Sequence, residues 1–227
     1  MKKNFIFESL TLLLLGGFTT LSLPPLNFYL INFFTFSLFF SFLFKKIKKS
    51  SNKKLFFYYG WLFGFGYFLT NLYWVTISLT HDTNFNFLIP IALILIPSFL
   101  AIFYALISLL FFMFNPKNIL SGFFLFSLLF GIIEFIRGTI LTGFPWNLII
   151  YSFSDNPSFL SILAVIGTYS LNLLIISIFT LPTLFILRKS KKEIIVCVLF
   201  LLLPILFLSY GNIQKKNFSK KIIIENS

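Results

Sequence analysis

The chain has 227 residues, of which 58% are hydrophobic, 21% aromatic and only 11% charged, and its formal net charge is +12. A chain with so few charged groups cannot cover its own surface in water, so a water-soluble globular domain is excluded and lipid is the expected solvent. The single cysteine, Cys197, excludes an internal disulfide, and the high aromatic content excludes intrinsic disorder.

Seven apolar stretches are long enough to cross a membrane, because a hydrocarbon core of about 30 Å needs about 20 helical residues. In chain order they cover residues 5–23, 26–44, 55–79, 87–114, 119–136, 159–187 and 194–210. The first stretch resembles a signal peptide, but Glu8 interrupts it and no small-x-small cleavage site precedes Pro24, so we expect a retained span. We predict an all-α, polytopic transmembrane bundle that occupies residues 1–210.

The basic residues lie in short runs between these stretches, mainly at residues 45–54 and 188–192. Lysine and arginine are retained on the cytoplasmic side during insertion, so we expect these loops and the N-terminus in the cytoplasm. The chain that follows the seventh span is then expected on the periplasmic side. Basic residues in loops, rather than along one helix face, are not typical of a nucleic-acid-binding protein. We therefore expect no nucleic-acid partner.

Glycine and aromatic residues mark the third stretch and the segment after it. Gly60 and Gly64, extended by Gly66, form a small-xxx-small pattern that predicts close packing against another helix. Tyr73 and Trp74 approach the outer interface. Aromatic residues at that depth either anchor the helix in the interface or contact a substrate, and the sequence leaves both roles open.

Glu134 and Arg137 are two ionisable residues near the outer end of the fifth stretch. Ionisable groups within a membrane are unfavourable by about 2.5 to 3.5 kcal/mol each on insertion scales, so they require a partner or a function. At positions i and i+3 of a helix they share one face and are expected to form an ion pair. The pair either anchors the helix end or contributes to a site for a lipid headgroup.

The segment after this pair cannot be a regular helix. Gly143 loosens the backbone, Pro145 lacks an N–H donor, and Trp146 prefers the membrane interface. An apolar stretch that breaks a helix is typical of a re-entrant or interfacial loop. Such a loop either forms a mouth that handles lipid or simply connects two spans.

No recognised catalytic constellation is present. His81 stands beside Asp82 in an outer loop, and we expect a solvated residue rather than a metal ligand or an acid–base group. Cys197 lies within the seventh stretch without a neighbouring base, and we expect it to pack rather than to act as a nucleophile. We therefore expect no metal, no cofactor and no complete catalytic site in these residues.

Residues 211–227 differ abruptly in composition from the chain before them, because polar and basic residues replace the apolar ones. Within this tail, residues 222–224 are three isoleucines and are typical of the opening of a buried β-strand. A lone strand is not stable, so we expect the tail to begin a soluble outer domain that the chain lacks. The alternative is a short frayed tail.

Several motifs together resemble the membrane domain of bacterial apolipoprotein N-acyltransferases. They are the glycine-rich run at residues 60–68, Asn-Leu-Tyr-Trp-Val at 71–75, Glu-Phe-Ile-Arg-Gly at 134–138 and Leu-Thr-Gly-Phe-Pro-Trp at 141–146. Pro24-Pro25 and residues 167–173 fit as well, and the resemblance covers most of residues 10–220. The motif at residues 134–138 together with the motif at residues 141–146 is the most specific part of the match.

The resemblance implies a multi-pass protein of the bacterial inner membrane. Enzymes of this family transfer an acyl chain from a phospholipid to the amine of the N-terminal diacylglyceryl-cysteine of an apolipoprotein. Their catalytic Glu, Lys and Cys belong to a nitrilase-like periplasmic domain after the seventh span, and none of the three lies in this sequence. The implied partners are a phospholipid donor, an apolipoprotein acceptor and, if it is encoded separately, the nitrilase-like domain.

No catalytic residue can be carried over, but a lipid-binding mouth can be predicted on the membrane half. The residues expected to shape it are Tyr73, Trp74, Glu134, Arg137, Gly143, Pro145 and Trp146. The chain alone is expected to be inactive. The competing interpretations are a small polytopic transporter and a non-catalytic, lipid-binding membrane scaffold.

Overall fold

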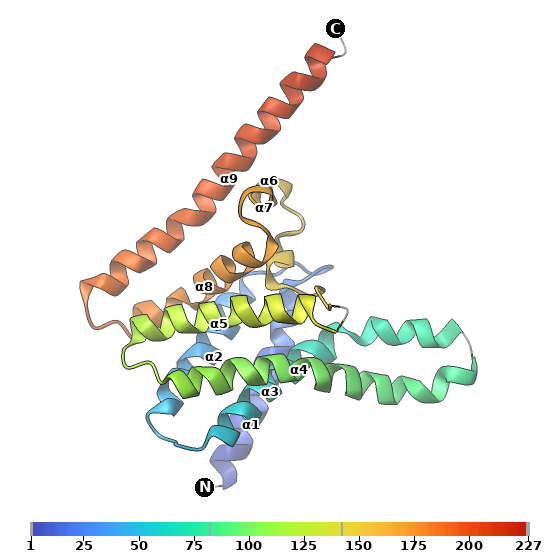
Figure 1. Cartoon of the computed structure of the whole chain (residues 1–227), viewed down its shortest axis with the longest axis vertical. Helices are drawn as coiled ribbons and strands as arrows, with labels where there is room; N and C mark the ends of the chain where they lie inside the picture. The colour runs from blue at the N-terminus through green and yellow to red at the C-terminus, as the bar shows by residue number, and fades with distance from the viewer. Residues whose placement is uncertain (1, 82, 142, 226–227) are drawn as a thin grey trace.

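The computed structural model describes residues 2–81, 83–141 and 143–225, and in these ranges the chain is helical with no strand (Figure 1). The α-helices are α1 (Lys2–Thr19), α2 (Ile31–Ile47), α3 (Lys53–Asn71), α4 (Ile89–Phe114), α5 (Ile119–Thr139), α6 (Pro157–Leu160), α7 (Leu163–Ile166), α8 (Thr168–Ile186) and α9 (Lys191–Glu225). Between them, the described residues form the 3₁₀ helices η1 (Thr20–Ser22), η2 (Tyr73–His81), η3 (Thr83–Leu88) and η4 (Ile149–Phe153). The predicted all-α bundle is confirmed.

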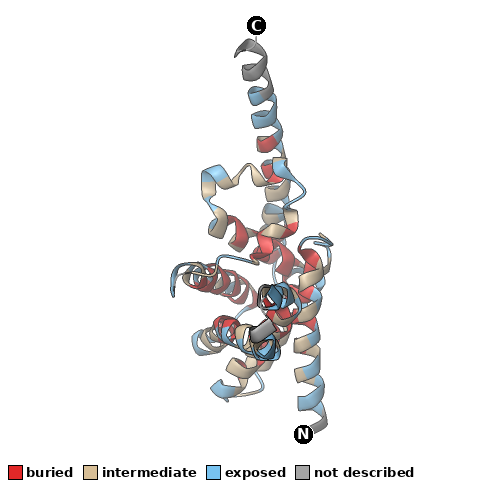
Figure 2. Ribbon diagram, turned by 90° about the vertical axis from the view of Figure 1, so that its right-hand side faces the viewer, coloured by how far each residue is buried: buried red, intermediate tan, exposed pale blue. Residues whose placement is uncertain are grey.

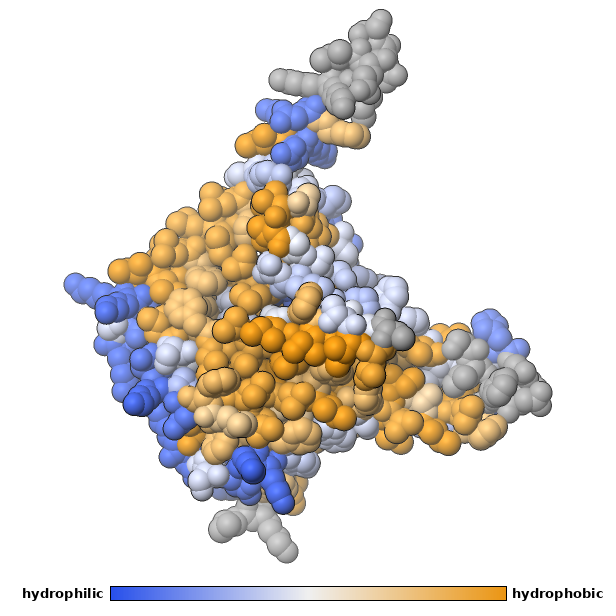
Figure 3. All heavy atoms as spheres, in the orientation of Figure 1, coloured by the Kyte–Doolittle hydropathy of each residue, from blue (hydrophilic) through white to orange (hydrophobic). Residues whose placement is uncertain are grey.

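The long helices run between two chemically different ends. Residues 45–54, 115–118 and 187–192 form what we call the lysine-rich end, where hydrophilic atoms gather along one edge of the molecule (Figure 3). Residues 20–30, 72–81, 83–88, 140–141 and 143–167 form the opposite end, which we call the loop end. An apolar belt separates the two (Figure 3), as expected of a protein that crosses a lipid bilayer.

Five segments of the described chain are long and apolar enough to cross a membrane. They are Asn4–Ser22, Asn86–Phe114, Ile119–Thr139, Thr168–Ile186 and Lys191–Phe218. The other two predicted spans are also helices: α2 has 17 residues, and α3 is less apolar because it begins with two lysines and carries glycine and tyrosine among its phenylalanines. The chain is therefore a multi-pass membrane protein.

Two predicted spans are shorter than the sequence suggested. The third ends at Asn71, and the chain continues as η2, in which Thr76 and Thr80 donate hydroxyl hydrogen bonds to carbonyls three residues earlier. Such bonds stabilise the tighter 3₁₀ turn. The sixth is divided because Gly167 has φ = 78°, which ends α7 before α8 begins.

The expectation of a β-strand at residues 222–224 was wrong, because α9 continues through these residues to Glu225. A strand needs a partner for its backbone groups, whereas a helix bonds its own, and no proline follows Pro204 to end α9. The division of the chain at residue 210 stays a prediction.

Helix α3 packs closely against α1 and α4, and buried residues gather in the middle of the molecule (Figure 2). A Cβ atom added at Gly60 would lie 2.4 Å from the Tyr104 carbonyl oxygen on α4, and one at Gly66 would lie 2.1 Å from the Leu13 carbonyl oxygen on α1. Only glycine permits such an approach, so the predicted small-residue packing is confirmed. Phenylalanine fills the remaining core, as where Phe39 stacks on Phe63 with ring centroids 4.1 Å apart.

Candidate functional site

The predicted ion pair at the end of α5 is present and fully buried. Arg137 Nε donates to Glu134 Oε2 at 2.8 Å, and Arg137 Nη2 donates to the same oxygen. Both residues are 1% exposed. Because a buried charge is stable only when it is paired and hydrogen-bonded, each residue depends on the other.

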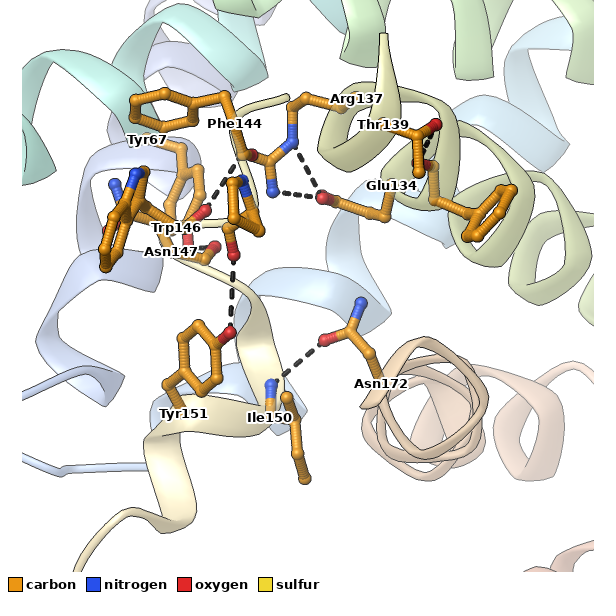
Figure 4. A network of polar contacts seen from close by, with 12 residues as sticks. Tyr67, Glu134, Arg137, Thr139, Phe144, Trp146, Asn147, Ile150, Tyr151 and Asn172 are labelled. Carbon is orange, nitrogen blue, oxygen red and sulfur yellow. Dashed lines mark hydrogen bonds and ion pairs between the residues drawn. The ribbon is translucent and has the colours of Figure 1, made fainter. Parts of the chain in front are cut away.

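Arg137 also holds the broken segment that follows α5. Its Nη1 donates to the carbonyl oxygens of Phe144 and Trp146, both at 2.9 Å (Figure 4). The Phe144 N–H donates back to the Arg137 carbonyl oxygen at 2.9 Å, and Gly143 turns the chain with φ = 80°. The helix break predicted from Gly143 and Pro145 is therefore confirmed, and the segment folds back over the end of α5.

Two further helices hold the rest of the loop by its backbone. The Tyr67 hydroxyl on α3 donates to the Asn147 carbonyl oxygen at 2.6 Å, and the Asn172 side-chain oxygen on α8 accepts from the Ile150 N–H at 3.0 Å (Figure 4). The Tyr151 hydroxyl donates to the Pro145 carbonyl oxygen at 3.4 Å. Partial burial of this phenol raises the pKa of Tyr151 above its ordinary value, so the hydroxyl, already protonated at neutral pH, stays a donor in more alkaline solution.

A large groove lies beside this loop, between α1 and α3. Its volume is about 1220 Å³, and we call it the loop-end groove. Most of its wall is apolar, with a few hydroxyl and amide groups at the loop end. The lining residues are Leu13, Leu14, Gly17, Phe18, Thr20, Leu21, Leu23, Pro24, Pro25, Leu26, Gly66, Leu69, Thr70, Asn71, Tyr73, Trp74, Trp146, Asn147, Tyr151 and Ser154.

The structure separates the predicted site residues into two groups. Tyr73, Trp74 and Trp146 line the loop-end groove, and all three are exposed. Glu134 and Arg137 are buried behind the loop and are not part of the groove wall. The remaining two predicted residues, at positions 143 and 145, lie in the turn between these groups and do not line the groove either.

Sequence reasoning missed the polar atoms of the groove wall. The hydroxyls of Thr20 and Thr70 lie 2.6 Å apart and join η1 to α3. The side-chain amide nitrogens of Asn71 and Asn147 are buried and have no hydrogen-bond partner. Asn71 stood in one of the motifs, but only the fold shows that it faces the same groove as Asn147.

The other residues considered for chemistry, Cys197 and His81, lie outside the loop-end groove. Cys197 is a buried free cysteine on α9, outside the groove wall. His81 is exposed at the end of η2, and its predicted neighbour Asp82 lies outside the described residues. Among the described side chains, no three His, Cys, Asp or Glu residues come together to hold a metal ion.

Comparison with known proteins gives a consistent result. The family model described as the apolipoprotein N-acyltransferase N-terminal domain matches residues 15–181. Apolipoprotein N-acyltransferase of Rhizobium etli is 34% identical over 184 residues, which is 78% of this chain and 34% of the relative. The enzyme of Rickettsia prowazekii is 35% identical over 205 residues, which is 89% of this chain and 40% of the relative.

The enzyme of Brucella melitensis is 33% identical over 186 residues, or 78% of this chain and 34% of the relative. The chain thus spans a little over a third of the length of the curated relatives that it matches.

Proposed function

Because the chain belongs to the apolipoprotein N-acyltransferase family, through that family's N-terminal domain, we propose that it is the membrane part of an acyltransferase. The reaction would move an acyl chain from a phospholipid to the N-terminal amine of a diacylated apolipoprotein. The lysine-rich end would face the cytoplasm, and the loop end would face the periplasm. In this orientation the loop-end groove would lie in the outer leaflet of the bacterial inner membrane.

The loop-end groove carries this proposal. Its volume of about 1220 Å³ exceeds the usual ~300–1,000 Å³ of a site for a drug-sized ligand, and its wall is mostly apolar. Trp74 and Trp146 stand on the wall at the loop end, which would lie at the membrane interface that tryptophan prefers. A groove that is apolar at depth and aromatic at the interface suits an acyl chain whose ester group lies at the loop end.

Unpartnered amides at the loop end of the groove support the same interpretation. The Asn71 and Asn147 amide nitrogens have no hydrogen-bond partner. A buried donor without a partner is unfavourable by about 1 to 3 kcal/mol, so an acceptor oxygen is expected to bind there. An ester carbonyl oxygen of a lipid would accept from these two amides and fix the depth of the chain.

The buried ion pair would act through the loop rather than on the lipid. Arg137 holds the carbonyls of Phe144 and Trp146, so it positions the Trp146 ring on the groove wall. Gly143 and Pro145 give the turn its shape. We therefore propose Tyr73, Trp74 and Trp146 as lipid contacts and the other four predicted residues as positioning residues.

The bond-forming chemistry would come from outside the described residues. None of the described side chains forms a pair of nucleophile and base beside the groove, and the resemblance assigns that chemistry to a nitrilase-like domain. The role proposed for this chain is to bind and orient acyl groups. The relatives above are named as acyltransferases, and no finding supports the transporter or scaffold alternatives.

Depletion of this chain from its source cell tests the reaction. We expect lipoproteins to accumulate with two acyl chains instead of three, as measured by mass spectrometry of their N-terminal peptides. Full triacylation after depletion would contradict the proposal.

A substitution that fills the loop-end groove tests whether lipid binds there. Gly17 lines it, and a Cβ atom there would make only ordinary contact, 3.5 Å from Thr70 Cγ2, so Gly17→Leu is expected to fold. The variant should reduce cross-linking of the groove by a phospholipid with a photoreactive acyl chain. Leu202→Phe, at an exposed position on α9, is the matched control and should leave the cross-linking unchanged.

A further inference from the structure

We propose that a second cavity binds one acyl chain of a phospholipid whose headgroup contains a positively charged amine. The cavity has a volume of about 400 Å³ and lies among α2, α8, α9 and the loop-end residues 152–156. We call it the α8–α9 cavity. It shares no lining residue with the loop-end groove, and the proposal does not depend on the acyltransferase reaction.

The depth of the cavity fits a single acyl chain. Its wall includes Ile175, Ile178 and Phe179 of α8 and Pro204 and Leu208 of α9. From the first residue of α8 to Phe179, a helix rises about 16 Å, which is about half of a 30 Å hydrocarbon core. The cavity therefore extends from the loop end to near the middle of the bilayer, between apolar walls.

The mouth of the cavity carries an uncompensated negative charge. Asp155 lies on the lining and is exposed, and its carboxylate accepts a hydrogen bond from the Asn27 side-chain amide. The ion pairs among the described residues use Glu8 and Glu134, so no described lysine or arginine neutralises Asp155. In a chain with a net charge of +12, a carboxylate without a basic partner at the cavity mouth favours a cationic ligand.

Aromatic rings beside the carboxylate favour the same ligand. Tyr29 and Phe153 line the mouth with their ring centroids 5.0 Å apart. Ammonium groups are attracted to the faces of aromatic rings, and this attraction adds to that of a neighbouring carboxylate. The combination suits the ammonium group of an ethanolamine headgroup.

A buried hydroxyl marks the next polar position. Ser152 lines the cavity, is only 2% exposed, and its hydroxyl has no hydrogen-bond partner. A buried hydroxyl without a partner is unfavourable, so an acceptor is expected beside it. With the ammonium group at Asp155 and the chain between α8 and α9, a phosphate or ester oxygen of the lipid would accept from Ser152.

A binding assay with two lipids that differ only in the headgroup tests the proposal. The probes are lysophosphatidylethanolamine and lysophosphatidylglycerol with the same acyl chain, added to the purified full chain in detergent and measured by native mass spectrometry. We expect the ethanolamine lipid to bind more tightly by about twofold to fivefold, as for an exposed ion pair. Asp155→Asn should bring the ratio close to one while binding of the acyl chain remains.

Ser161→Ala is the control, because Ser161 lies in the same loop-end segment, lines neither cavity, and its hydroxyl donates to the Pro157 carbonyl oxygen. It should leave the preference unchanged. A preference that persists in Asp155→Asn, or that disappears equally in Ser161→Ala, would overturn the proposal. The assay contains no acyl transfer, so its outcome is separate from that of the proposed function.

A labelling experiment on the unaltered chain locates the acyl chain without any variant. Lysophosphatidylethanolamine with a photoreactive group in the middle of its chain should label peptides of α8 and α9 around Ile178 and Leu208. Ile178→Trp, which fills the cavity, should lower this labelling several-fold. Labelling confined to α1 and α3 would place the lipid in the loop-end groove and would refute the second site.

Discussion

The two polar clusters inside this bundle differ in what their basic residue holds. At the lysine-rich end, Lys46 contacts both carboxylate oxygens of Glu8 at 2.5 and 2.6 Å, and Tyr59 donates to the same carboxylate. At the loop end, Arg137 bonds Glu134 and also two backbone carbonyls of the following loop. One cluster joins side chains of three helices, whereas the other determines the path of a chain segment.

Exposure separates the two clusters as well. The side chains of Lys46 and Glu8 are 19% and 25% exposed, and those of Arg137 and Glu134 are 0% and 1% exposed. Partly exposed pairs contribute little because water and ions screen them, whereas a buried charge that loses its partner is strongly destabilising. The loop end therefore depends on its ion pair far more than the lysine-rich end does.

The largest effect is expected from Arg137→Ala. The change leaves the Glu134 charge buried without a partner and frees the carbonyls of Phe144 and Trp146. We expect the free energy of unfolding to fall by about 3 to 5 kcal/mol. Denaturation of the purified chain in mixed micelles, followed by circular dichroism, measures this change, and a loss below about 1 kcal/mol would contradict the contrast between the clusters.

Replacing both Glu134 and Arg137 separates the effect of an unpaired buried charge from the effect of the lost loop contacts. In the double variant Glu134→Leu with Arg137→Met, no charge is left buried, so we expect about 1 to 4 kcal/mol more stability than in Arg137→Ala. The loop carbonyls still lack their donor, so photo-cross-linking of lipid in the loop-end groove should remain impaired. Normal cross-linking in the double variant would show that the loop keeps its place without Arg137.

The sequence predicted the parts of the loop end that depend on local spacing. The i, i+3 spacing indicated the pair of Glu134 and Arg137, and Gly143 with Pro145 indicated the helix break. The carbonyls that Arg137 holds could not be predicted, because their direction depends on how the turn folds back over α5. The pair of Glu8 and Lys46 was missed for a related reason, since 38 residues separate its members and only the packing of α1 against α2 and α3 brings them together.

The ends of several helices could not be predicted from the sequence either. The apolar content of residues 72–79 and 159–166 continues that of the neighbouring helices, so hydropathy alone extended two spans through them. The 3₁₀ bonds of η2 and the positive φ of Gly167 end these α-helices earlier, and both features depend on backbone geometry. In α9 the error was opposite, because a local resemblance to a strand overrode the continuous helix.

An intermediate effect is expected from removal of one hydroxyl at the loop end. In Tyr67→Phe the Asn147 carbonyl oxygen loses its donor, while the ring keeps its buried position. We expect a loss of about 0.5 to 1.5 kcal/mol in the free energy of unfolding. Faster amide hydrogen exchange should be confined to the loop around residues 147–151, and exchange that is equally faster in α1 or α2 would contradict a local role.

The smallest effect is expected from Lys46→Met, the counterpart of a change at Arg137. Methionine keeps the apolar contacts of the Lys46 stem, and Glu8 keeps its bond from Tyr59 and remains partly exposed to water. The free energy of unfolding should fall by about 0 to 1 kcal/mol, and less at high salt, where the lost pair is already screened. The same denaturation assay measures both clusters, and a loss at Lys46 as large as that at Arg137 would mean that burial is not what distinguishes them.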